Sequence, residues 1–198
     1  MTAVRTRRSS AETRELVLDV AADLFYGNGI RATGIDRVAA VAGVAPTTLY
    51  RLYASKDDLV AAYLEHSEVG YLEWLDRTAR SGGTARERVL AVFDQQAEVT
   101  AAAEFRGCPF LMALAEFPDP QHPAHVRAIG TKAAVRRRVR ELVEELATEG
   151  PVRDRAVLAD QLMLVMEGVY AAVSVFGDAG PAQQARGVAR ALLDAASR

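Results

Sequence analysis

Apolar side chains recur at helical spacing along almost the whole chain, and this feature restricts the fold more than any other. Between residues 16 and 25, for example, Leu16, Val17, Val20, Ala21, Leu24 and Phe25 lie on one face of a helix that Gly27 to Gly29 would end. No stretch alternates apolar and polar residues between turn residues, as a half-buried strand would. The sequence therefore predicts an all-α fold.

Four helix starts carry a capping pattern, in which a serine or threonine precedes an acidic residue by three positions. The four pairs are Ser9 with Glu12, Thr33 with Asp36, Ser55 with Asp58, and Thr84 with Glu87. Glycines and prolines mark most other junctions. The later helices are predicted at 56–80, 84–105, 110–116, 123–149, 153–176 and 181–196.

Two short helical patterns between residues 35 and 54, broken at Gly43, have the spacing of a helix-turn-helix motif. Small or apolar residues stand where its two helices would touch, namely Val38, Ala39, Ala42, Val44, Leu49 and Leu52. The second helix is predicted at 46–53. The alternative is a plain helical hairpin inside a bundle.

The outer face of this second helix is polar and suits the major groove of DNA. Arg51 can donate two hydrogen bonds to a guanine edge, and Thr47 can meet a base or a thymine methyl. Thr48 and Tyr50 suit phosphate oxygens, and Lys56 adds a positive charge in the first turn of the next helix. We predict that these residues bind double-stranded DNA.

The charge distribution agrees with a polyanionic partner. The 198 residues carry a formal net charge of -2, but residues 1–56 hold eight Lys/Arg against five Asp/Glu. Arg5, Arg7 and Arg8 form either an arm that touches DNA or a solvated tail.

The segment from Thr33 to Leu59, TGIDRVAAVAGVAPTTLYRLYASKDDL, resembles the DNA-binding domain of the TetR/AcrR family of bacterial repressors. The resemblance implies that Tyr50 and Lys56 hold phosphates and that Pro46, Thr47, Thr48 and Arg51 face the groove. We include Thr33 among the DNA-binding residues. Two positions depart from the family pattern: Ala45 replaces a frequent capping serine, and Leu52 replaces a frequent histidine.

We predict a DNA-binding domain at 1–56 and a helical bundle at 57–198 for dimerisation and ligand binding. The segment 162–176 is apolar on nearly every side, so its helix needs two partners. We expect its own core on one side and a second subunit on the other, with Val188, Leu192 and Leu193 of the last helix completing the contact. Gly187, Ala191 and Ala195 would permit close approach. A monomeric bundle is the alternative.

Aromatic and sulfur-containing residues in the second domain suit a mostly apolar small molecule. Glu167 lies within its most apolar helix and needs a partner there. The alternative for each residue is ordinary core packing. The predicted lining is Phe93, Gln96, Phe105, Cys108, Phe110, Leu111, Phe117, Met163, Met166, Glu167 and Tyr170.

Several other classes of protein have little support. The N-terminus lacks the apolar stretch of a secretory signal, and the run 162–176 is short for a membrane span, so we expect a cytoplasmic protein without membrane contact. Cys108, His122 and His125 lack diagnostic metal or catalytic spacing. We therefore expect no metal, no cofactor and no enzymatic activity.

The sequence thus predicts a dimeric repressor that binds a palindromic operator and is released when a small, mostly apolar effector binds. The helix at 56–80 would act as the lever between the domains. The alternatives are a DNA-binding regulator without a small-molecule ligand and a helical enzyme that uses Cys108.

Overall fold

The computed structural model describes residues 8–177 and 179–197, and within them every regular element is helical. The helices are α1 (Ser10–Asn28), α2 (Ile35–Ala42), α3 (Pro46–Leu52), α4 (Lys56–Ala79), α5 (Ala85–Thr100), α6 (Pro109–Glu116), α7 (Pro123–Glu149), α8 (Arg155–Phe176), the short 3-10 helix η1 (Pro181–Gln184) and α9 (Ala185–Ala196). The all-α prediction is confirmed.

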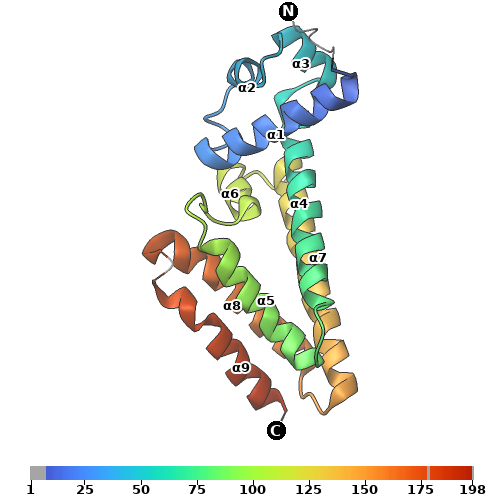
Figure 1. Cartoon of the computed structure of the whole chain (residues 1–198), viewed down its shortest axis with the longest axis vertical. Coiled ribbons are helices and arrows are strands. Elements are labelled where there is room, and N and C mark those ends of the chain that lie inside the picture. The colour runs from blue at the N-terminus through green and yellow to red at the C-terminus, as the bar shows by residue number, and fades with distance from the viewer. Residues whose placement is uncertain (1–7, 178, 198) are drawn as a thin grey trace, which may run out of the picture.

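The helices form an elongated molecule with a small group at one end and a larger bundle at the other (Figure 1). Helices α1, α2 and α3 surround the start of α4, which then runs down into the bundle of α5, α7, α8 and α9. Helix α6 packs on α7 and lies directly beneath α1. It is therefore placed between the two ends.

Three of the four predicted capping pairs are present, and two are complete capping boxes. Ser9 with Glu12 and Thr84 with Glu87 each exchange two hydrogen bonds with the backbone, whereas Ser55 accepts only from the amide of Asp58. The prediction for Thr33 was wrong. Helix α2 begins after Gly34 and has no side-chain cap, because the Thr33 hydroxyl donates instead to the carbonyls of Leu24 and Gly29.

Helix α5 is shorter than predicted and ends at Thr100 rather than at residue 105. The chain turns through residues 101–108, where Gly107 has a φ of +124°, a conformation that favours glycine. This turn places Phe105 and Cys108 beside α8 rather than along α5.

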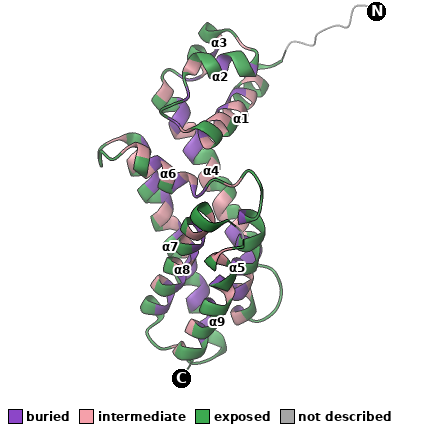
Figure 2. Cartoon of the chain, turned by 90° about the vertical axis from the view of Figure 1, so that its left-hand side faces the viewer, coloured by how far each residue is buried: buried purple, intermediate pink, exposed green. Residues whose placement is uncertain are grey.

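Buried apolar residues form two cores (Figure 2). The upper core joins α1, α2, α3 and the first half of α4 to α6, to the start of α7 and to Tyr170 of α8. The lower core joins the end of α4 to α5, α7, α8 and α9. The upper core therefore packs the helix-turn-helix directly against parts of the second predicted domain.

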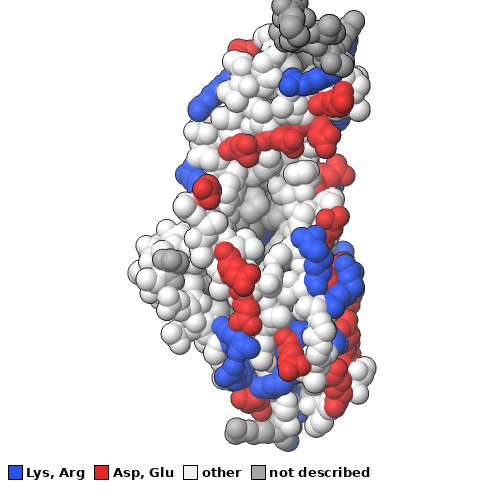
Figure 3. Space-filling model, viewed as in Figure 1, with Lys and Arg blue, Asp and Glu red and all other residues white. Residues whose placement is uncertain are grey.

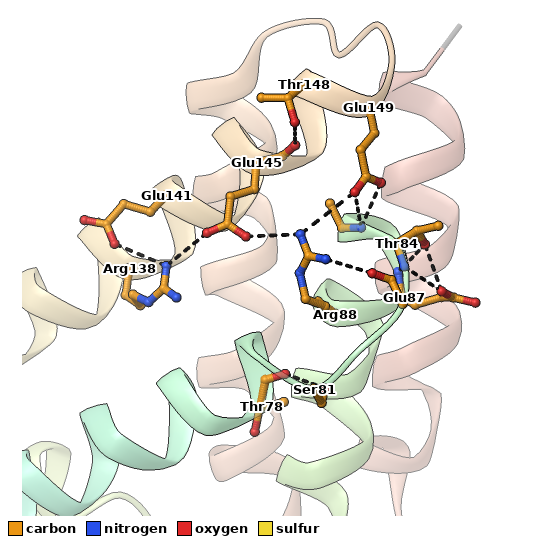
Figure 4. Close-up of polar contacts among 12 residues, drawn as sticks. Thr78, Ser81, Thr84, Glu87, Arg88, Arg138, Glu141, Glu145, Thr148 and Glu149 are labelled. Atoms are coloured by element: carbon orange, nitrogen blue, oxygen red, sulfur yellow. Dashed lines mark hydrogen bonds and ion pairs between the residues drawn. The ribbon is translucent and has the colours of Figure 1, made fainter.

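Polar contacts fix the start of α5 against the end of α7 (Figure 4). The Glu149 carboxylate accepts from the backbone amide of Ala85 at 2.8 Å, and Arg88 pairs with Glu145 at 3.3 Å. Arg138 pairs with Asp76 of α4 and with Glu141 of its own helix. These contacts bind α4, α5 and α7 into one unit at the end opposite to α3.

By length and composition alone, helix α8 could cross a membrane. The helix covers residues 155–176 and is therefore longer than the apolar run at 162–176. In the fold it packs against α7, α9 and α5. Glu167, near its middle, pairs with Lys132 of α7 at 2.8 Å. Some apolar residues of α8 are therefore buried in the lower core, and others remain exposed on a second side of the helix.

Candidate nucleic-acid interface and ligand cavity

The α2–α3 turn has the geometry of a helix-turn-helix. Gly43 ends α2 with a φ of +65°, and its amide and that of Val44 bond back to the carbonyls of Ala40 and Ala39. Leu49 of α3 is fully buried against the upper core. One buried leucine and one left-handed glycine thus set the angle of α3.

The opposite face of α3 is open to solvent. Tyr50 is 50% exposed, Pro46, Thr47 and Arg51 are exposed, and Thr48 is half-buried. Ala45 precedes α3 without a side-chain cap, and Pro46 occupies the first turn, as its lack of an amide hydrogen permits. The residues predicted to face the groove therefore share one exposed surface.

Arg14 of α1 holds the C-terminal end of α3, a role that the sequence analysis missed. Its guanidinium donates to the Leu52 carbonyl and lies 4.2 Å from the centre of the Tyr53 ring. The Tyr53 hydroxyl in turn donates to the Arg14 carbonyl at 3.2 Å. No motif flags this contact, because it joins positions nearly forty residues apart in the chain.

Two other predicted DNA-binding residues, Lys56 and Thr33, form hydrogen bonds to backbone carbonyls. Lys56 is half-buried, and its Nζ donates to the Arg31 carbonyl at 3.3 Å. Thr33 is fully buried, with its hydroxyl bonded to the backbone as described above. The assignment of Thr33 to the DNA surface is therefore corrected: this side chain fixes the turn after α1.

Charge is unevenly distributed over the upper end. Exposed Arg37 and Arg51 lie on α2 and α3 with one exposed acid, Asp36, whereas exposed Glu15, Asp19 and Asp23 lie on α1 with exposed Arg14. A row of acidic groups accordingly crosses the molecule at the level of α1, below the basic groups (Figure 3). Such a row repels phosphate groups. Arg5 and Arg7 lie outside the described residues.

Two adjoining cavities of about 230 Å³ each lie below α1 and share Tyr71, Val99 and Tyr170. The upper cavity is also lined by Tyr26, Ser67, Phe105, Gly107, Cys108, Pro109 and Phe110. The lower cavity adds Gly70, Trp74 and Gln96. No lining residue among these carries a formal charge.

Six of the thirteen residues that line the two cavities are aromatic. Tyr71 stacks on Trp74 with ring centres 5.6 Å apart, and Phe105 stacks on Tyr170 at 5.9 Å. The two tyrosine hydroxyls lie within 3.1 Å of each other. Burial raises the pKa of both tyrosines well above its ordinary value, so both hydroxyls stay protonated.

An ion pair lies next to this wall. The Lys132 ammonium is 5.5 to 6.0 Å from the ring centres of Tyr170, Tyr71 and Phe110, and it pairs with Glu167. The Lys132 side chain is 13% exposed and that of Glu167 is 24% exposed. Glu167 therefore has the partner that its position in an apolar helix requires.

Two residues connect the cavity wall to the upper end. Tyr26 of α1 lines the upper cavity, and its hydroxyl donates to the Gly107 carbonyl and accepts from the Arg106 amide. Glu116, the last residue of α6, accepts from the amides of Ile30 and Arg31 at 2.9 and 2.6 Å. Helix α6 is thereby attached to the turn that leads into α2.

The comparisons with known proteins agree with this geometry. The family model "Bacterial regulatory proteins, tetR family" matches residues 17–63, and the model "Tetracyclin repressor-like, C-terminal domain" matches residues 85–189. This chain belongs to the TetR family. It is therefore a DNA-binding transcriptional regulator of a family that is not enzymatic.

Individual TetR-family proteins are similar along most of the chain. The HTH-type transcriptional regulator YjdC of Escherichia coli is 31% identical over 160 residues, covering 78% of this chain and 80% of the relative. The crystal structure of SCO4454, a TetR-family regulator from Streptomyces coelicolor, superposes with a TM-score of 0.88 at 31% identity and covers 95% of this chain and 97% of its own. A regulator from Saccharomonospora viridis in complex with choline shares the fold, with a TM-score of 0.75 at 15% identity over 93% and 96% of the two chains.

The structure brings part of the predicted ligand set to the cavities. Phe105, Cys108, Phe110 and Tyr170 line the upper cavity, and Gln96 lines the lower one. Phe93 and Met166 instead line a narrow crevice in the lower core. The sequence analysis missed Tyr26, Ser67, Tyr71 and Val99. The patterns of their helices indicated core packing and, for the helix at 56–80, a connection between the domains, but no ligand contact.

Besides Phe93 and Met166, four more of the predicted ligand residues do not line the two cavities. Leu111 is 39% exposed, and Phe117 stacks on His122 with ring centres 4.2 Å apart. Met163 packs on the lower core, and Glu167 is occupied by Lys132. These residues are close in the chain to residues that line the cavities, but their own side chains lie elsewhere.

Cys108, His122 and His125 each have a role in packing or in backbone hydrogen bonding. Cys108 is buried in the upper core, His122 caps the start of α7, and His125 bonds to the Phe117 carbonyl at 2.8 Å. Among the described residues, no group of three or more His, Cys, Asp or Glu side chains is placed to hold a metal ion.

Proposed function

We propose that this TetR-family regulator is a dimeric repressor that binds a palindromic operator and leaves it when a small, mostly apolar effector occupies the paired cavities. The observation that carries the proposal is that one residue, Tyr26, belongs both to the cavity wall and to the helix-turn-helix domain. A ligand in the cavity therefore touches the part of the protein that positions α3.

Recognition of DNA would rest on α3. Arg51 and Thr47 would contact base edges in the major groove, with Pro46 against the groove wall, while Thr48, Tyr50 and Lys56 would hold phosphates. The exposure of Thr47, Tyr50 and Arg51 on one face supports this division. Lys56 would have to exchange its bond to the Arg31 carbonyl for a phosphate oxygen.

Dimerisation would use the exposed side of α8 and α9. Leu164 is 73% exposed, Val175 71% and Phe176 64% on α8, and Val188 is 45% exposed on α9. Gly187, Ala191 and Ala195 are also exposed and would let two copies approach closely. Leu193, which we expected at this contact, is fully buried in the lower core of its own chain, so it is left out of the proposed contact.

Two copies joined by these four helices would present two α3 helices about a two-fold axis. A palindromic operator with half-sites about one DNA turn apart, or slightly more, would match this symmetry. Leu164→Asp would place a charge in the contact, and we expect it to convert a dimer into monomers by analytical ultracentrifugation. A dimer that survives Leu164→Asp at the same protein concentration would contradict this interface.

The switch would run through two contacts. A ligand between Tyr71, Phe105 and Tyr170 would displace the loop that Tyr26 bonds at Arg106 and Gly107, and with it α6. Glu116 would carry the shift to Ile30 and Arg31, ahead of α2. Release needs only that the ligand prefers the conformer in which the two α3 helices no longer fit successive grooves.

The first experiment measures binding of the purified protein to the DNA upstream of its own gene by fluorescence anisotropy, at two salt concentrations. We expect specific binding that weakens with salt and that Arg51→Ala weakens further, because phosphate and base contacts are both involved. Arg77→Ala is the matched control, since Arg77 is exposed on α4 with only a surface pair to Glu73.

Compounds are then screened for release of that DNA. Binding that no compound relieves would favour a regulator without a small-molecule ligand. Failure to bind either this DNA or a randomised palindrome library would contradict the proposed recognition surface.

A further inference from the structure

Two residues that line the lower cavity each carry a buried polar atom that has no hydrogen-bond partner among the described residues. The two atoms are Oε1 of Gln96, whose residue is 1% exposed, and the indole Nε1 of Trp74. One is an acceptor and the other a donor. An unpaired buried polar group costs about 1 to 3 kcal/mol, so each gains if a bound molecule supplies the missing partner.

The acceptor role of Gln96 is fixed by its other contact. Its amide nitrogen Nε2 donates to the Met166 carbonyl of α8 at 2.9 Å. Rotating the amide by half a turn would bring two oxygens together and lose this bond. The Tyr170 hydroxyl donates to the Tyr71 hydroxyl, so Oε1 is an acceptor that a ligand with a hydrogen-bond donor can meet.

The walls select against a charged ligand. The lining of both cavities holds no formal charge, and Lys132, a cation beside their aromatic rings, is already paired with Glu167. An ion moved from water into such a site without a counter-charge carries a large desolvation penalty. Lys132 also lies against Tyr71, Phe110 and Tyr170, which therefore already interact with one cation.

The walls also favour a flat molecule. Tyr71 stacks on Trp74 and on Phe110, and Phe105 stacks on Tyr170. Aromatic pairs in offset stacks gain about 0.5 to 1.5 kcal/mol beyond the area that they bury. A planar ligand can continue these stacks.

We propose that the effector is an uncharged planar molecule with at least one hydrogen-bond donor and one acceptor, which Gln96 Oε1 and Trp74 Nε1 recognise. This inference rests on the proposed effector role of the cavities and narrows it to a chemical class. Gln96 and Trp74 are thereby specificity-determining residues of the site.

The test uses the fluorescence of Trp74, the only tryptophan among the 198 residues. The probe is 2-quinolone, a neutral two-ring compound with one N–H donor and one carbonyl acceptor. Its matched relatives are 1-methyl-2-quinolone, which lacks the donor, naphthalene, which lacks both groups, and the cation N-methylquinolinium. We expect 2-quinolone to bind about fivefold to tenfold tighter than 1-methyl-2-quinolone, as the loss of one hydrogen bond implies, with naphthalene and N-methylquinolinium weaker still.

Variants assign this preference to the two residues by isothermal titration calorimetry. Gln96→Leu should abolish the difference between 2-quinolone and its methyl derivative, and Trp74→Phe should weaken 2-quinolone without affecting naphthalene. Gln95→Leu is the matched control, because Gln95 is the exposed neighbour on the same helix. If Gln96→Leu fails to fold, the binding of 2-quinolone and naphthalene to Trp74→Phe alone decides whether the inference holds.

Equal binding of all neutral probes, or tightest binding of N-methylquinolinium, would overturn the inference. Probe binding is measured without DNA, whereas release is measured with DNA, so the two proposals fail separately. A probe that binds but releases no DNA would contradict the proposed switch and leave the ligand class standing. Release by a charged compound alone would leave the switch standing and contradict the ligand class.

Discussion

The proposed DNA-binding surface and the cavities are built in opposite ways. Apart from Lys56 of α4, the surface comes from consecutive residues of one seven-residue helix, α3, with a single fully buried anchor in Leu49. The cavity draws its lining from α1, α4, α5, α6, α8 and the loop before α6, and it carries unpaired polar atoms inside. A site on one helix can be altered one contact at a time, whereas a site between six segments changes when any of them moves.

The largest expected effect comes from Leu49→Ala, which tests whether the two sites are separable. Removing this fully buried side chain should lower the free energy of unfolding by about 2 to 5 kcal/mol and abolish DNA binding, because α3 loses its anchor. Binding of 2-quinolone, followed by Trp74 fluorescence at 15 °C, should change less than about twofold. Val41→Ala, at a position 59% exposed on α2, is the control and should leave both unchanged. Loss of both binding activities in Leu49→Ala would show that the two regions fold as one unit.

Arg51→Ala tests the surface alone. It should weaken specific operator binding by about 1 to 3 kcal/mol, the range for a bidentate contact to a base, and leave the melting temperature unchanged. The measurement is anisotropy with operator and scrambled DNA in parallel. If both DNAs weaken equally, Arg51 contacts phosphate rather than a base.

Glu116→Gln tests the connection between the regions. The neutral amide keeps one acceptor for the amides of Ile30 and Arg31 but loses the charge, and we expect a loss of about 1 kcal/mol in stability. That corresponds to roughly 2 to 4 °C in melting temperature for a chain of this size. The fold-change in DNA affinity on adding a releasing compound should shrink severalfold. Glu104→Gln, at an exposed loop position, should leave that response intact.

The smallest expected effect is at two helix caps, one at the start of α1 and one at the start of α5, which should respond to pH in the same way. Hydrogen bonds from the backbone of Ser9 and Thr84 lower the pKa of Glu12 and Glu87 below the usual 4.5. Each capping contact is therefore fully present above pH 4.5 and is lost as the pH falls through the lowered pKa. Melting temperatures between pH 7 and pH 3 should fall less steeply in Glu12→Gln and Glu87→Gln than in the unmodified chain. Identical slopes would show that these caps add nothing measurable at either end.

The sequence predicted the elements of the fold because its signals are local. Apolar spacing along each helix and the caps at Ser9 and Thr84 act within a few residues, and so does the turn at Gly43. The same locality explains why the exposed face of α3 was found. It also explains the error at Thr33, whose hydroxyl turns inward to carbonyls of the preceding turn rather than capping the next helix.

The cavity was only partly predictable, because its composition resembles ordinary core. Phe105 and Tyr170 line it and Phe93 does not, although all three are aromatic residues in helical surroundings. The difference arises where α5 ends at Thr100 and the chain turns, and no local pattern marked that end.

The sequence by itself determined an all-helical chain, a helix-turn-helix near its start and the exposed polar face of α3. These follow from interactions between residues a few positions apart. Only the tertiary structure decided which side chains enclose the cavities, that Arg14 holds α3, and that Tyr26 and Glu116 join the cavity walls to the helix-turn-helix end. Such contacts join residues up to about ninety positions apart, and they depend on how whole helices pack rather than on any periodicity within one of them.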